Sequence, residues 1–136
     1  MLGDRWVMVV GRRVDRFTDL EVWRRSHGLF LSVLKDLGDL PRTRAAAALT
    51  DLVVRSLGSI GANLAEGFNR SRNRYLNALD IALGEAAESE NWLYKLRDTG
   101  FLAPDRANAH ILELIEIQKM LHGLARAIRR TQSSNH

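Results

Sequence analysis

Apolar residues recur at intervals of three or four positions in four successive stretches of this chain. Such spacing places the apolar side chains on one face of an α-helix. The first three stretches end at residues that stop helices, namely Gly38 with Pro41, then Gly67, then Gly100. Four helices joined by short connections predict an all-α fold, an antiparallel up-down-up-down four-helix bundle.

The segment Thr18-Asp19-Leu20-Glu21 matches a capping box, in which the threonine oxygen accepts from a main-chain amide and the glutamate reaches back. It predicts that the first helix begins at Thr18. The other predicted helices run from Arg42 or Thr43 to Glu66, from Ser71 to about Asp98, and from Pro104 towards the C-terminus.

The 136 residues, 46% hydrophobic and 26% charged, are typical of one globular domain. There is no cysteine, which excludes disulfides, thiolate metal sites and a cysteine nucleophile. The apolar run Trp6–Val10 is far shorter than the roughly 18 residues of a membrane span. We expect a cytoplasmic protein with no membrane partner. It divides into a weakly attached or disordered N-terminal arm (1–16), the bundle (17–130) and a polar C-terminal tail (131–136).

One segment joins a helix of small residues to a basic turn: Ser59-Ile-Gly-Ala-Asn-Leu-Ala-Glu-Gly-Phe68, followed by Asn69-Arg70-Ser71. With the segment Phe17–Trp23 and the acidic segment Gly84–Glu90, it resembles the bacterial four-helix-bundle proteins encoded within intervening sequences of large-subunit ribosomal RNA genes. The likeness extends from Phe17 to about Arg130. The chain departs from the family pattern at Gly61, where proline is usual, and within the acidic segment.

The same bundle is shared by the accessory variability determinants of diversity-generating retroelements. The resemblance therefore implies two kinds of role. In one, the protein works with a reverse transcriptase and its RNA. In the other, it belongs to the ribosomal intervening-sequence branch and acts as a protein-interaction scaffold. The resemblance also implies a ring-like homo-oligomer, typically a pentamer.

The second predicted helix has a face of small residues beside its apolar stripe, on which backbones approach closely. This face suits either tight packing within one subunit or contact with another. The fourth predicted helix carries apolar residues beyond the roughly 100° arc that one buried face requires. We therefore predict an oligomer interface from both helices: Gly58, Ala62, Ala65, Ile117, Met120 and Leu124.

Catalytic and metal-binding patterns are weak in this sequence. A two-metal helical bundle needs a Glu-x-x-His pair on each of two helices, and none occurs. No nucleophile turn or glycine-rich phosphate loop is recognisable. We expect no enzyme activity, metal or cofactor, with an acid–base pair of Asn63 and Glu66 as a distant alternative. Glu90, on the core stripe of the third helix, needs a partner or must be protonated, and His110 and Arg44 are the candidate partners; the alternative is a carboxylate at the edge of the bundle.

Arginine clusters mark the chain ends and the second connection, in a protein of formal charge +4 and pI near 10.1. In an up-down bundle these segments meet at one pole. The guanidinium group suits phosphate recognition. We therefore predict a non-catalytic accessory protein that binds structured RNA or an RNA–DNA hybrid, with the same arginines docking an acidic protein as the alternative. The predicted nucleic-acid-binding residues are Arg70, Arg72, Arg74, Arg126, Arg129, Arg130, Arg12, Arg13 and Arg16.

Overall fold

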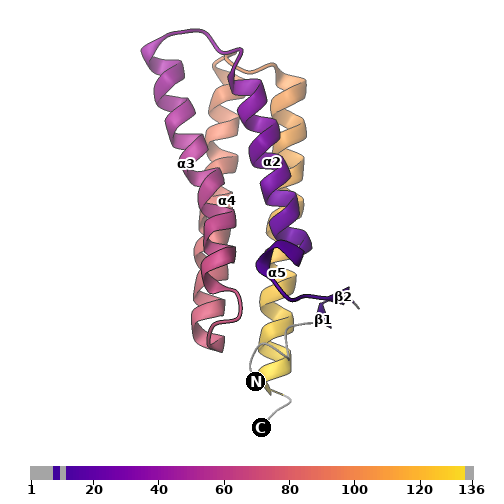
Figure 1. Ribbon diagram of the computed structural model, residues 1–136. Coiled ribbons are helices and arrows are strands. Elements are labelled where there is room, and N and C mark those ends of the chain that lie inside the picture. Colours follow the sequence, from indigo (N-terminus) through magenta and orange to yellow (C-terminus); the bar gives the residue numbers. More distant parts are fainter. Residues whose placement is uncertain (1–7, 10–11, 134–136) are drawn as a thin grey trace.

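The computed structural model describes residues 8–9 and 12–133, with side chains for residues 13–131. Figure 1 shows four long helices side by side, with the chain reversing direction at each connection between them. The predicted all-α fold with four helices is confirmed. The helices are α2 (Glu21–Leu37), α3 (Arg44–Gly67), α4 (Arg72–Asp98) and α5 (Pro104–Ser133).

The chain before α2 contacts the bundle through Val14, Leu20 and the η1 turn. Strands β1 (Met8–Val9) and β2 (Arg12–Arg13) form a short antiparallel hairpin. The side chain of Val14 is buried in the main core, so attachment to the bundle begins before Phe17. At the other end, α5 continues to Ser133. The predicted arm and tail otherwise fall on residues 1–7, 10–11 and 134–136, which lie outside the described residues.

The predicted capping box at Thr18 is wrong. A 3-10 helix, η1 (Phe17–Asp19), comes first, and α2 begins only at Glu21. The carboxylate of Asp19 accepts hydrogen bonds from the main-chain amides of Asp15 and Arg16, both at 3.0 Å. A charged oxygen that binds two amides is a stronger cap than a neutral hydroxyl, so Asp19 rather than Thr18 organises this turn.

The remaining helix ends agree with the sequence signals. The hydroxyl of Thr43 accepts from the amide of Ala46 at 3.1 Å and caps α3. Ser71 caps α4 by accepting from the amide of Arg74 at 3.4 Å. After α4, Gly100 adopts a φ of 79°, in the left-handed region that glycine tolerates best. The predicted bounds of these helices are therefore confirmed to within about two residues.

The core is built from the apolar stripes of all four helices. On α3, the apolar stripe consists of Val53, Leu57, Ile60 and Leu64 and is fully buried. By length and hydropathy alone α3 would also qualify as a membrane span. Of that apolar window in α3, 28% is buried inside the fold, and the buried part of the helix includes this stripe.

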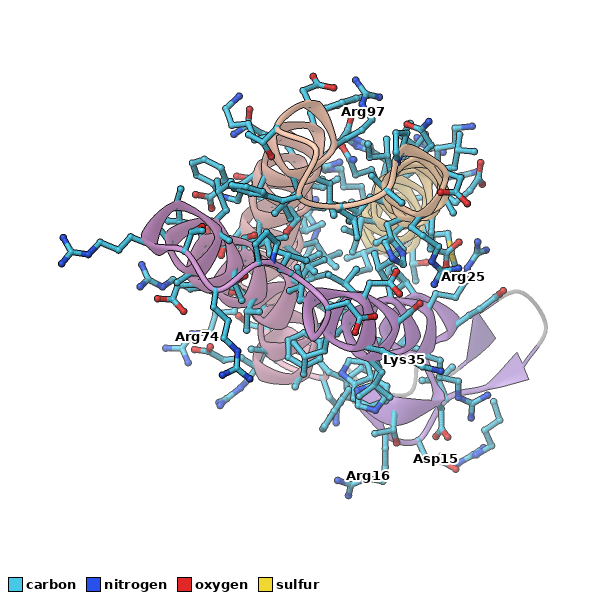
Figure 2. All side chains as sticks on the ribbon, turned by 90° about the horizontal axis from the view of Figure 1, so that it is seen from above. Asp15, Arg16, Arg25, Lys35, Arg74 and Arg97 are labelled. Atoms are coloured by element: carbon cyan, nitrogen blue, oxygen red, sulfur yellow. The ribbon has the colours of Figure 1, made fainter. Side chains whose placement is uncertain are left out.

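Polar contacts join α2 to α5 along one side of the bundle. Arg25 binds Glu113 through two hydrogen bonds, with Nε to Oε2 at 2.9 Å and Nη2 to Oε1 at 2.5 Å. Figure 2 shows Arg25 projecting between these two helices. Closer to the α2–α3 connection, Asp36 accepts from Arg106 Nε at 3.0 Å and lies 2.6 Å from Nε2 of the buried His110. Both contacts link residues at least 70 positions apart in sequence.

Asp36 gives a testable pH dependence. Burial by itself would raise the pKa of this carboxyl, but hydrogen bonds and positive charge from Arg106 and His110 outweigh it and lower the pKa below 3.8. At pH 7 we expect Asp36→Asn to reduce the free energy of unfolding by about 1–3 kcal/mol. A carboxyl whose pKa is lower in the folded state than in the unfolded state stabilises the fold at pH values above its unfolded pKa, and this stabilisation is lost as pH falls through the folded pKa. The difference in unfolding free energy between Asp36→Asn and wild type should therefore vanish at acidic pH.

The measurement is urea unfolding at pH 7 and at a series of acidic pH values. Asp51→Asn, which removes an exposed carboxylate from α3, is the matched control and should change stability little. The same loss for Asp36→Asn at every pH would contradict the assigned electrostatic role.

Candidate nucleic-acid interface

Three segments rich in arginine lie at the same end of the bundle. The α3–α4 turn, the β1–β2 hairpin and the C-terminal end of α5 are together at the lower end of the molecule in Figure 1. We call this end the arginine pole. It carries all the arginines that the sequence singled out, although the side chain of Arg12 lies outside the described residues. The described side chains are those of Arg13, Arg16, Arg70, Arg72, Arg74, Arg126, Arg129 and Arg130.

The arginine pole is not one continuous patch. Seen along the bundle, Arg74 and Arg16 lie well apart around its circumference (Figure 2). Arg16 is exposed, with its guanidinium carbon 5.9 Å from the centre of the Phe17 ring. Arg13 is partly neutralised by Asp15, whose carboxylate accepts from its Nε at 3.0 Å. The arginines before α2 are therefore separate from those after α3.

The three arginines after α3 differ from one another. Arg70 and Arg74 are exposed, and Arg70 is steadied by a 3.3 Å hydrogen bond from its Nε to the carbonyl of Glu66. Arg72 is half-buried, and its Nε has no hydrogen-bond partner among the described residues. Arg70 and Arg74 are thus the two that a ligand reaches most easily. On α5, the arginines at positions 126, 129 and 130 are all exposed.

A polar cleft lies between α3 and α4 at the arginine pole, and we call it the α3–α4 cleft. Gly67 and Ala78 form its floor, where the two helices approach closely. A Cβ atom built on Gly67 would lie only 2.4 Å from the Cβ of Ala78, so glycine is required there. The cleft is lined by Asn63, Glu66, Gly67, Arg70, Arg74, Asn77, Ala78 and Ile81.

Comparisons with known proteins identify the family of this chain. Residues 18–123 match the 23S rRNA-intervening sequence protein family. The chain belongs to that family. A crystal structure of an S23 ribosomal protein family member of unknown function from Bacteroides thetaiotaomicron is similar, with a TM-score of 0.71 and 28% identity. The similarity covers 77% of this chain and 95% of that one. No curated protein matches the chain.

The region shared with the 23S rRNA-intervening sequence family contains the α3–α4 cleft but not every arginine of the pole. Asn63, Arg70 and Asn77 fall within the matched residues 18–123. Arg126, Arg129 and Arg130 of α5 and the arginines before α2 fall outside the matched residues. The sequence singled out Asn63 and Glu66 only as a distant acid–base alternative, and Asn77 and Ile81 were not predicted. These two follow Arg74 at intervals of three and seven, the spacing of one helical face, so the signal was present.

The predicted oligomer interface on α5 is wrong for two of its three residues. Ile117 is 0% exposed and Leu124 is 7% exposed, because both pack in the core of the subunit. Met120 is half-buried, and its sulfur accepts from Arg25 Nη1 at 3.7 Å. The broad apolar arc of α5 arises because this helix packs against both α2 and α4. The wide apolar arc of α5 therefore indicates contact with two helices of the same subunit.

The small face of α3 does reach the surface. Gly58 and Ala62 are exposed and Ala65 is half-buried. Together with α2 they form an apolar groove, the α2–α3 groove, whose α2 wall includes Phe30 and the exposed Leu31. Indole and imidazole rings of Trp23 and His27 stack beside it at 4.7 Å between centroids. This groove is lined by Trp23, Ser26, His27, Phe30, Leu31, Leu57, Gly58, Gly61, Ala62 and Ala65.

Glu90 is half-buried and accepts a 2.8 Å hydrogen bond from Gln118. Neither His110 nor Arg44 is its partner, so both predicted pairings are wrong. His110 binds Asp36 and Arg44 is exposed. An amide on the facing helix satisfies the carboxylate at the edge of the core, without a second charge. Within the described residues, no group of three potential metal ligands converges.

Proposed function

We propose that this protein is a non-catalytic, oligomeric accessory protein that binds structured RNA or an RNA–DNA hybrid through its arginine pole. The observation that carries the proposal is the pair Arg70 and Arg74. Both are exposed, both line the α3–α4 cleft, and neither forms an ion pair with a described residue. Two free planar guanidinium groups on one cleft suit the oxygens of a phosphate backbone.

The proposal involves no catalytic step in the cleft. Among the residues that line it there is no hydroxyl, thiol or imidazole that would serve as a nucleophile. A binding role uses the groups that are present, namely two cations, two amides and one carboxylate. The resemblance to retroelement accessory proteins supports a further element of the proposal, that the bound nucleic acid is presented to a reverse transcriptase.

We propose the α2–α3 groove as the contact with a second copy of the chain. Its floor of small residues leaves room for a protruding apolar side chain, and Leu31 on its rim is 53% exposed. An exposed apolar side chain lies on a different helix, since Leu112 of α5 is 65% exposed. This side chain would insert into the groove of a neighbouring subunit. Two different complementary patches on each subunit are what a closed ring requires. A ring would repeat the arginine pole and strengthen weak phosphate contacts by avidity.

The test of nucleic-acid binding compares two double variants with the same change in charge. Arg70→Glu with Arg74→Glu alters the α3–α4 cleft, whereas Arg42→Glu with Arg44→Glu alters exposed residues at the opposite end of the bundle. Affinity for a structured RNA is titrated at several salt concentrations. We expect the cleft variant to lose at least about tenfold in affinity and about 1.5 units of salt slope, because two phosphate contacts disappear.

The control variant should stay close to wild type in affinity and slope, and circular dichroism should show that both variants remain folded. Equal losses in the two variants would mean that only net charge matters and would remove the cleft from the mechanism. Absence of RNA binding by the wild-type protein would reject the proposal and favour an acidic protein as the partner of these arginines.

A further inference from the structure

The α3–α4 cleft contains two hydrogen-bond acceptors, of which Asn63 is held in place by the fold and Glu66 is exposed. The Asn63 side-chain nitrogen donates to the carbonyl of Ser59 at 2.8 Å and to its hydroxyl at 3.0 Å. The amide is therefore fixed with its oxygen as the free acceptor. The carboxylate of Glu66 lines the same cleft and forms no hydrogen bond or ion pair with any described residue. These two groups together would receive N–H donors from a ligand.

The cleft also offers cations and apolar surface beside those acceptors. Arg70 and Arg74 would hold an anionic group, and the close-packed Gly67 and Ala78 line the cleft with no side chain larger than a methyl, so a flat ring would lie over them. Ile81, at the rim, is 45% exposed and would cover one face of such a ring. A ligand that satisfies all three features has an N–H edge, a planar body and a negative charge. A nucleotide has this combination.

The free carboxylate discriminates among the four RNA bases. Guanine presents two adjacent N–H donors on its Watson–Crick edge, N1–H and N2–H, which pair with both oxygens of one carboxylate. Adenine and cytosine present one amino group beside an acceptor nitrogen, and uracil presents one N–H between two carbonyls. An acceptor beside a carboxylate is repelled. Guanine is thus the only standard RNA base that matches Glu66 in two positions.

We propose that the α3–α4 cleft binds an unpaired guanine nucleotide of RNA. Glu66 accepts from N1–H and N2–H, and Arg70 and Arg74 bind the phosphate. The base must be unpaired because a Watson–Crick partner would occupy the same edge, and proteins read RNA sequence mainly in loops, bulges and ends. This inference rests on the proposed RNA-binding function and names what the same site recognises.

The test uses GMP, AMP, CMP and UMP as probes of the full-length protein, with affinity measured by NMR titration. We expect GMP to bind about tenfold more tightly than the other three, the discrimination typical of a two-point base contact. Glu66→Gln should abolish this preference while leaving AMP binding no weaker, because removing a negative charge favours the phosphate. Glu88→Gln removes an exposed carboxylate from α4, away from the cleft, and should keep the preference.

A second measurement compares RNA hairpins that differ only in one unpaired loop nucleotide. A guanine preference that depends on Glu66 supports the inference. Equal affinity for all four loops, with Arg70 and Arg74 still required, overturns the guanine site but leaves RNA binding intact. Selective GMP binding without binding of any hairpin would reject the proposed function and keep the site. No GMP binding at millimolar concentration, or equal binding of the four nucleotides, overturns the inference.

Discussion

Ile117→Arg is expected to unfold the bundle. The side chain of Ile117 is 0% exposed and lies in the main core. An arginine there would bury an unpaired charge, at a cost of about 3–5 kcal/mol, in addition to the strain of overpacking. This is comparable with the whole stability of many domains. Thermal unfolding followed by circular dichroism should show a large drop in midpoint or no cooperative transition.

Glu116→Arg is the control for this experiment, because it introduces the same side chain at the adjacent, exposed position of α5. It gives up only a surface pair with Lys119, at 3.2 Å, and should cost less than about 1 kcal/mol. Similar stability for the two variants would mean that Ile117 is not enclosed within the subunit, and that the broad apolar arc of α5 faces another molecule after all.

Ala62→Arg is expected to convert a closed oligomer into a monomer without loss of helix. Ala62 is exposed and lies in the α2–α3 groove, so the longer side chain has room in the isolated subunit. In an assembled ring it would place a charge and extra volume between two apolar surfaces. Light scattering should return a multiple of the 15.3 kDa subunit mass for wild type and a single subunit for the variant.

The matched control for this prediction is Ala87→Arg, which changes an exposed alanine of α4 outside the groove. It should assemble like wild type. A wild-type protein that remains monomeric at tens of micromolar would end the oligomer proposal. An Ala62→Arg variant with the wild-type mass would instead move the contact to another surface.

Sequence periodicity predicted the helices because capping and apolar spacing are local properties. Thr43 and Ser71, which were predicted only as the approximate starts of two helices, cap those helices. The predicted start of the first helix at Thr18 is too early, because the carboxylate of Asp19 binds the main-chain amides of Asp15 and Arg16 and closes the 3-10 turn η1, and α2 begins only at Glu21.

The sequence pattern of each helix does not predict which side chains of two different helices contact each other. The pairing of Asp36 with His110 and that of Glu90 with Gln118 depend on the rotation of each helix about its axis. A change of one residue in that rotation turns a side chain by about 100° and selects different partners. For the same reason, the sequence brought the arginine segments to one end but did not show that Arg16 and Arg74 lie apart from one another there.

The end of the bundle at which the chain enters and leaves has a practical consequence. The β1–β2 hairpin and the last turns of α5 both lie at the arginine pole (Figure 1). An affinity tag or fluorescent protein fused before the hairpin or after α5 would therefore be attached at the same end of the bundle as the α3–α4 cleft. Reporters are better inserted in the α2–α3 connection, at residues 38–43, at the far end of the molecule.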